Sequence, residues 1–225
     1  MGYSCLRKNV MPDIQAIGQQ VGNSCGAFSL AAVANALNKV PASGIQKKTI
    51  DYTPDDKKIG TKRKTSFDPS SQPSTFAQEI YQLTGNLNEQ TFQYLEEPTK
   101  LGFNSVSGLV KIAQELGLNC VVNVAKDSIV TNLPIYSTEK DLVKKLGGIV
   151  NENAVYNKPQ SQHHQLICVL EKGYPTHWIA LGTDLIYYDP RHNTNNTSWD
   201  ITQNQKTMSN YDLYEFSGLW IALSA

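Results

Sequence analysis

The chain has 225 residues, enough to bury a sizeable core either as one domain or as two closely packed lobes. Lys plus Arg and Asp plus Glu are equal at 20 each, so the formal net charge of zero gives no general attraction to nucleic acid or to membranes. Its 4 cysteines have neither the spacing of a zinc site nor that of a disulfide framework, and no apolar run is long enough to cross a membrane. We therefore expect no metal ion, no cofactor and no nucleic-acid partner.

The first residues, MGYSCLRKNVMPD, lack the apolar core of a secretory signal. Gly2 and Cys5 resemble part of a dual acylation signal, but Leu6 stands where the myristoylation pattern has Ser or Thr. The sequence therefore predicts a cytoplasmic protein, with lipid modification as an alternative. Delivery as a secreted effector is a second alternative, because proteins exported by needle-like systems also lack an ordinary signal.

The stretch 17–37, IGQQVGNSCGAFSLAAVANAL, changes from turn-forming residues to an apolar, alanine-rich run. We expect a buried helix that begins at or just after Ser24, with Cys25 in its first turn. Free N–H groups and the helix dipole favour a thiolate there, and the thiolate is the nucleophilic form of cysteine. Gln19 precedes Cys25 by six residues, so its side-chain amide could join the Cys25 N–H in stabilising an oxyanion.

A single cysteine on a helix is more often a small buried apolar side chain than a nucleophile. Catalysis by Cys25 is therefore a hypothesis that requires a base further along the chain and a group that orients this base.

Residues 38–75 are rich in Lys, Asp, Thr, Ser and Pro, which predicts a long surface excursion. Because this segment directly follows the Cys25 helix, an alternative is that it covers a cleft. Amphipathic spacing then predicts two short helices, over 76–83 and 89–95.

Ser105 or Ser107 is the expected N-cap of the next helix, which Gly117 would end. The apolar run 119–124 predicts a buried strand, and a further helix is expected over 138–146 before a Gly-Gly pair.

From residue 165 onward, apolar and polar residues alternate with a period of two. Helices first and antiparallel strands last indicate an α+β fold. We expect a single catalytic domain over 1–225, with a helical part over about 14–150 and an antiparallel sheet over about 151–225. The expected strands are 165–170, 177–181, 185–189 and one near 214–223.

The segment THWIALGTDLIYYDP predicts a hairpin in which two apolar strands flank Gly-Thr-Asp. With a three-residue loop centred on Thr183, His177 lies directly opposite Asp189, and their Cβ atoms would be about 4.5–5.5 Å apart on one face. Asp189 would then accept a hydrogen bond from one imidazole nitrogen and leave the other for a cysteine. A two-residue turn would instead set Trp178 against Asp189 and place the carboxylate on the wrong face.

Three other histidines are rivals for the role of base. His163 and His164 open the preceding strand, and we expect no carboxylate against them. His192 lies in the loop DPRHNTNNTSW, where a solvated side chain is expected. His177 is therefore the candidate with a matched acid.

The order of Gln19, Cys25, His177 and Asp189 resembles that of papain-like cysteine peptidases. The pattern QxxxxxCG followed by HWIALGTDLIYYDP is similar to that of bacterial C39-like peptidases, which couple a Cys-Gly helix start to a histidine-led apolar strand and a following Asp-Pro. The stretch QQVGNSCGAFSLAAVANAL is also locally similar to the cysteine motif of ubiquitin C-terminal hydrolases.

The resemblance implies a papain-like fold in which a helical lobe that carries the cysteine packs on an antiparallel sheet. It implies Cys25 as nucleophile, His177 as base, Asp189 as its orienting acid and Gln19 as oxyanion donor. Acyl transfer from a protein or peptide substrate would follow, with water or an amine as the acceptor. The function predicted is a cysteine peptidase; the alternatives are a glutamine deamidase or transglutaminase-like effector, a deubiquitinase-like hydrolase and a binding module with a decayed triad.

Overall fold

The computed structural model describes most of the chain between Asp13 and Ala225. Gln19, one of the predicted site residues, lies outside the described residues, as does the N-terminal stretch considered for acylation. The described residues are 13–18, 21–39, 48–52, 63–67, 72–97, 100–159, 163–196, 207–209 and 212–225.

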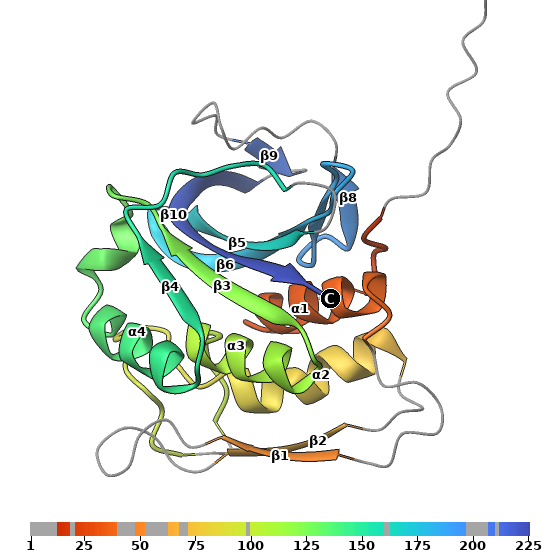
Figure 1. Ribbon diagram of the computed structural model, residues 1–225, viewed down its shortest axis with the longest axis horizontal. Helices are drawn as coiled ribbons and strands as arrows, with labels where there is room; N and C mark the ends of the chain where they lie inside the picture. The colour runs from red at the N-terminus through yellow and green to blue at the C-terminus, as the bar shows by residue number, and fades with distance from the viewer. Residues whose placement is uncertain are drawn as a thin grey trace, which may run out of the picture.

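Helices lie along one face of a large sheet (Figure 1). The first of them, α1, starts at Cys25, and the helical region precedes most of the sheet in the sequence. The helices are α1 (Cys25–Ala36), α2 (Pro73–Thr84), α3 (Val106–Glu115), the 3₁₀ helix η1 (Ile129–Asn132) and α4 (Tyr136–Lys145).

The large sheet has the strand order β4-β3-β10-β5-β6-β7-β8, and β9 pairs with one end of β10. β3 and β4 are parallel, whereas the other neighbours in this sheet are antiparallel. The α+β prediction is therefore confirmed. The strands are β1 (Lys48–Tyr52), β2 (Arg63–Phe67), β3 (Asn119–Val124), β4 (Ile149–Glu152), β5 (His164–Glu171), β6 (Tyr174–Leu181), β7 (Tyr187–Asp189), β8 (Thr194–Asn196), β9 (Thr207–Ser209) and β10 (Asp212–Ser224).

The main core fills the space between the helices and the sheet. Residues 25–34 of α1 are all buried, because an alanine-rich helix has a small radius and no polar face. The Ser29 hydroxyl, which would otherwise be unsatisfied there, donates to the carbonyl of Trp178 at 3.2 Å. This contact joins α1 directly to β6.

The opposite face of the sheet carries a second apolar cluster, which contains Ile179 and Tyr214. Side chains alternate along β6, so Trp178 and Ala180 face the helices whereas Ile179 and Leu181 face the second cluster. His177 has the same parity as Ile179 and therefore belongs to the face opposite the helices. The Cys25 sulfur at the start of α1 approaches β6 from the helix side, at the Thr176 carbonyl next to His177.

Local patterns predicted several elements at their observed places. β3 covers the expected stretch 119–124. α3 begins after Ser105, whose hydroxyl accepts a hydrogen bond from Gly108 N at 3.1 Å, and Gly117 follows its end with a φ of +72°.

The helix predicted over 89–95 was wrong, because this stretch forms a turn. The Asn88 side chain accepts hydrogen bonds from Gln90 N at 2.9 Å and Thr91 N at 3.0 Å, which satisfies these N–H groups without a helix. Phe92 then has a φ of +55°, outside the helical region.

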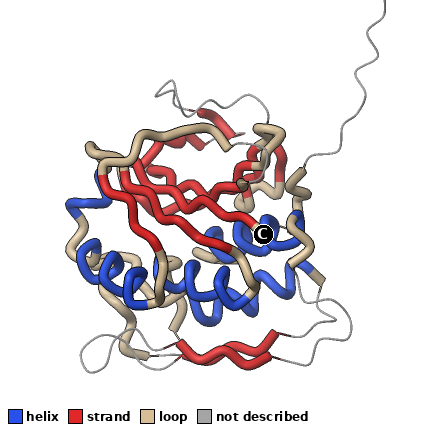
Figure 2. The backbone as a smooth tube through the Cα atoms, viewed as in Figure 1, coloured by secondary structure: helices blue, strands red, loops and turns tan. Residues whose placement is uncertain are grey.

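The surface excursion predicted over 38–75 contains an antiparallel hairpin that was not expected, formed by β1 and β2. Figure 2 shows this hairpin on the side of the helices away from the large sheet, and β2 lies against α2. In the described part of the chain, no helix combines the length and apolar character needed to cross a bilayer.

Candidate active site

Cys25 is the first residue of α1, and its side chain is buried. Ser24 occupies the N-cap, but its hydroxyl accepts a hydrogen bond from Val21 N at 3.1 Å instead of capping the helix. The Ser24 side chain therefore does not cap the first N–H groups of α1, which lie next to the Cys25 sulfur. This sulfur lies 3.7 Å from the carbonyl oxygen of Thr176 on β6. Among the described residues Cys25 is a free thiol.

A buried asparagine, Asn104, holds the turn that precedes Cys25. Its Nδ2 donates to the Asn23 carbonyl at 2.6 Å, and its Oδ1 accepts from the Thr84 hydroxyl at 2.8 Å. A Cβ on Gly26 would lie 2.9 Å from Asn104 Cβ, so only glycine leaves space for this side chain. The glycine after the cysteine thus has a packing reason, which the sequence motif alone did not reveal.

His177 and Asp189 are paired in the interior. His177 Nε2 lies 3.0 Å from Asp189 Oδ1, and the two side chains are 0% and 5% exposed. Both residues lie on the face of the sheet opposite the helices, which agrees with the predicted pairing of these two side chains.

The predicted register of the hairpin was wrong. Leu181 pairs with Tyr187 and Ala180 with Tyr188, so the loop spans 182–186 and Asp189 is displaced by two positions from the place opposite His177. A shift of two preserves the face on which a side chain lies, and the histidine therefore reaches the carboxylate diagonally.

The physical reason for the longer loop is a contact with the N-terminal part of the chain. Asp13 Oδ2 accepts hydrogen bonds from Thr183 N at 3.1 Å and from the Thr183 hydroxyl at 2.7 Å. Asp184 in turn accepts from Asp13 N at 2.8 Å. The sequence of the hairpin alone does not indicate these hydrogen bonds.

Asp189 is held by more than the histidine. Its Oδ1 also accepts from Arg191 N at 3.0 Å, and its Oδ2 accepts from the Tyr214 hydroxyl at 3.3 Å. The Arg191 guanidinium makes two bonds of 2.6 Å to the Glu171 carboxylate, which fixes the loop after β7. Tyr214 and Arg191 were not predicted.

The surroundings of His177 favour its charged form. Burial by itself lowers the pKa of His177, but the hydrogen bond to Asp189 and the nearby Cys25 side chain raise it to about 9. Within the described part of the chain, no group makes a hydrogen bond of ordinary geometry with the buried Nδ1. Because Nε2 is engaged by Asp189, Nδ1 is the nitrogen available to the Cys25 thiol.

The rival histidines have other surroundings. His163 is exposed, and His192 lies half-buried in the turn after β7. His164, contrary to expectation, has a carboxylate against it, because its Nε2 lies 2.9 Å from Asp13 Oδ2. This pair belongs to the contact between the N-terminal segment and the hairpin loop.

Gly18, which precedes Gln19 in the sequence, is fixed from both sides. Its N–H donates to Asn193 Oδ1 at 2.9 Å, and its carbonyl accepts from the Tyr188 hydroxyl at 2.8 Å. The chain just before Gln19 is therefore tied to the strand that carries Asp189 and to the loop that follows it.

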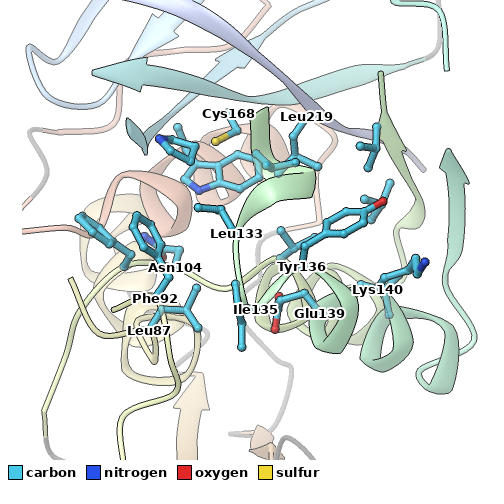
Figure 3. A pocket seen from close by; sticks show the side chains of 18 of the residues that line it. Leu87, Phe92, Asn104, Leu133, Ile135, Tyr136, Glu139, Lys140, Cys168 and Leu219 are labelled. Carbon is cyan, nitrogen blue, oxygen red and sulfur yellow. The ribbon is translucent and has the colours of Figure 1, made fainter. Parts of the chain in front are cut away.

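An apolar cavity of about 70 Å³ borders the site. Thr176, whose carbonyl contacts the Cys25 sulfur, is part of its wall. Figure 3 shows Cys168 and Leu219 at the sheet side of this cavity and Glu139 on the helix side. An apolar group would enter it with a smaller desolvation penalty than a polar one.

Glu139 is a buried acid that sequence patterns did not mark as unusual. Its carboxylate accepts from Ser107 N and from the Ser107 hydroxyl, both at 2.7 Å, so α4 supplies the polar partner for the start of α3. Burial raises the pKa of Glu139 to about 7, although the backbone bonds from Ser107 and Val106 oppose this shift. Its spacing from Leu142 and Val143, three and four residues later, is the signal for a buried position.

No group of three or more His, Cys, Asp or Glu side chains in the described part of the chain is arranged to hold a metal ion.

The match to a family model identifies the class of protein as a cysteine protease. The chain belongs to the invasion plasmid antigen J cysteine protease family, whose model matches residues 18–225. A search of curated proteins found no match, and neither did a search of solved structures. The match confirms the prediction that the protein is a cysteine peptidase. Cysteine proteases act on protein substrates.

Replacing Asn104 by Ala is expected to lower kcat/KM about tenfold, because the Asn23 carbonyl and the Thr84 hydroxyl both lose a buried partner beside Cys25. Peptide hydrolysis measured together with thermal unfolding tests this expectation. Asn119→Ala, which removes an exposed bond to Ala225 O, is the matched control. A loss of stability with unchanged kcat/KM would contradict a role of Asn104 in placing Cys25.

Proposed function

We propose that the protein is a cysteine peptidase in which Cys25 is the nucleophile, His177 the general base and Asp189 the residue that orients the imidazole. The observation that carries this proposal is the pairing of His177 Nε2 with Asp189, which directs Nδ1 to the Cys25 thiol. Gln19 and the Cys25 N–H are the proposed donors to the oxyanion.

The reaction begins when the Cys25 proton passes to His177 Nδ1 and the thiolate attacks the carbonyl carbon of the scissile peptide. The resulting oxyanion collapses, the C–N bond breaks, and His177 gives its proton to the leaving amine. Water then enters, loses a proton to His177 and attacks the thioester. Cleavage of the C–S bond releases the carboxylic acid, and the thiol regains its proton.

The same residues support three finer assignments. We propose that residues 1–225 form one catalytic domain of papain-like type, since the α1 helix with Cys25 packs on the sheet that carries His177 and Asp189. Among papain-like families, the order and spacing of the motifs favour the C39-like peptidases over the ubiquitin C-terminal hydrolases. The family description, invasion plasmid antigen J, supports delivery of the protein as a secreted effector.

Iodoacetamide modification followed by mass spectrometry, as a function of pH, tests the activated thiol directly. Burial raises the pKa of Cys120 and of Cys168 to about 12, so neither should compete with Cys25. We expect Cys25 to react fast well below about pH 8 in the wild type and to lose this reactivity in His177→Ala. The exposed His163, changed to Ala, provides the control.

Slow modification of Cys25 in the wild type, at the rate of an ordinary buried thiol, would contradict the proposal. If Cys25 is reactive, the products that the protein forms from a mixture of protein substrates distinguish the candidate reactions. New amino termini indicate a peptidase, whereas release of ammonia without new termini indicates a glutamine deamidase.

A further inference from the structure

Tyr214 is a buried aromatic residue in the first part of β10, on the same face of the sheet as His177 and Asp189. It comes from a strand that pairs with β5 and not with β6 or β7, so one strand, β5, lies between Tyr214 and the strand that carries His177. The proposed roles of Cys25, His177, Asp189 and Gln19 do not involve Tyr214.

A bend in β10 brings this side chain over the site. The register of β10 against β5 shifts between Phe216 and Leu219, and Gly218 lies between them with a φ of +84°. A Cβ at Gly218 would come within 2.6 Å of Ser128, so another residue there would disturb the bend. Figure 1 shows the resulting strong curvature of β10.

Tyr214 contacts both partners of the His–Asp pair. Its ring stacks on the His177 ring, with centroids 5.0 Å apart and planes at 25°. Its hydroxyl donates to Asp189 Oδ2 at 3.3 Å, the oxygen that does not face the histidine.

We propose that Tyr214 is a positioning residue, which keeps Asp189 Oδ1 directed at His177 Nε2 and keeps the imidazole plane directed at Cys25. This inference rests on the proposed function of the site.

The physical basis is the freedom of the two side chains that Tyr214 touches. A carboxylate rotates easily about its last bond, and a donor on Oδ2 restricts this rotation. The stacked ring limits tilting of the imidazole and excludes water from one of its faces, which strengthens the His–Asp hydrogen bond. Tyr214 itself exchanges no proton and makes no bond to the substrate.

The groups around the imidazole come from three elements. Cys25 lies at the start of α1, Asp189 on β7 and Tyr214 on β10. The Arg191–Glu171 ion pair lies next to them and holds the backbone N–H that binds Asp189. Removal of the Tyr214 hydroxyl should therefore change the reactivity of Cys25, because Asp189 and His177 connect the two side chains.

Tyr214→Phe tests the proposal, because it removes the hydroxyl and keeps the ring. The matched control is Tyr156→Phe, which removes the hydroxyl that donates to Gln165 at 2.9 Å and keeps a ring packed on Phe216 and Trp220. The first readout is the pH profile of Cys25 alkylation by iodoacetamide. The second is the low-field proton NMR signal of the hydrogen bond between His177 and Asp189.

For Tyr214→Phe we expect Cys25 alkylation near about pH 6 to slow about tenfold, as for the loss of one hydrogen bond to a charged group. The low-field signal should shift or broaden. Tyr156→Phe should keep the wild-type profile and signal, since its hydroxyl does not touch the pair.

A Tyr214→Phe profile and signal identical to those of the wild type would overturn the positioning role while leaving the triad intact. Absence of fast alkylation in the wild type would instead refute the proposed function itself. If the phenylalanine variant does not fold, difluorotyrosine at position 214 supplies a stronger donor of similar size. It should move the low-field signal measurably, and an unmoved signal contradicts the proposal.

Discussion

Replacing Asp189 by Ala is expected to lower kcat/KM for peptide hydrolysis by a factor of about 10³–10⁴. Without the carboxylate, His177 Nε2 has lost the acceptor at 3.0 Å that fixes its tautomer, and nothing directs Nδ1 to the thiol. The raised pKa of His177 should fall at the same time, because the bond to Asp189 is a main cause of the increase. Initial rates on a cleaved protein substrate, recorded over a range of pH, measure both effects.

Asp189→Asn should be milder, with a loss of about 10- to 100-fold. The amide oxygen can still accept from His177 Nε2 and Arg191 N, and the Tyr214 hydroxyl can accept from the amide nitrogen. The exposed Asp127, changed to Ala, serves as the control for removal of a carboxylate. More than a tenth of wild-type activity in Asp189→Ala would contradict the role proposed for this residue.

Replacing Glu139 by Gln is expected to remove a pH dependence of stability worth about 3 kcal/mol. Burial raises the pKa of Glu139 from 4.5 to about 7, so between these values the folded protein holds a proton that the unfolded chain has released. The free energy of unfolding therefore falls as the pH rises from 4.5 to about 7 and does not fall further through this group. Urea unfolding at about pH 5 and about pH 7.5 measures the difference.

In Glu139→Gln the amide oxygen can accept from Ser107 N while its nitrogen donates to the Ser107 hydroxyl, so the contact between α3 and α4 persists. Glu96→Gln, at an exposed position, should keep the wild-type slope. His177 affects the free energy of unfolding mainly at higher pH. Its raised pKa stabilises the folded protein below pH 6.5, and this stabilisation is lost as the pH rises through about 9. Parallel pH curves for the wild type and Glu139→Gln would contradict the prediction.

Local patterns sufficed for the elements whose own residues determine them. Alanine content and the GNS turn placed the start of α1 at Cys25, and an apolar run placed β3. The hairpin of β1 and β2 and the short strands β4, β8 and β9 were missed, because three to five residues carry too little alternation. The false helix at 89–95 had helical spacing, but Asn88 offered its N–H groups a local acceptor.

The candidate site was predictable to the extent that its geometry is local. His177 and Asp189 lie twelve residues apart, so the parity of one hairpin brings them to one face. The register depended on Asp13, and the surrounding contacts on Asn104 and Tyr214, which come from distant parts of the chain. Long-range hydrogen bonds of this kind leave no periodic trace in a single sequence.

The central position of β10 has a consequence for how the chain folds during its synthesis. β10 lies between β3 and β5, although it follows both in the sequence. A nascent chain that already displays Cys25, His177 and Asp189 therefore has two unjoined half-sheets until the ribosome has made β10, because β3 and β5 do not pair with each other. The large sheet is therefore complete only after β10 has inserted between β3 and β5, which makes this insertion a late step of folding that depends on long-range contacts.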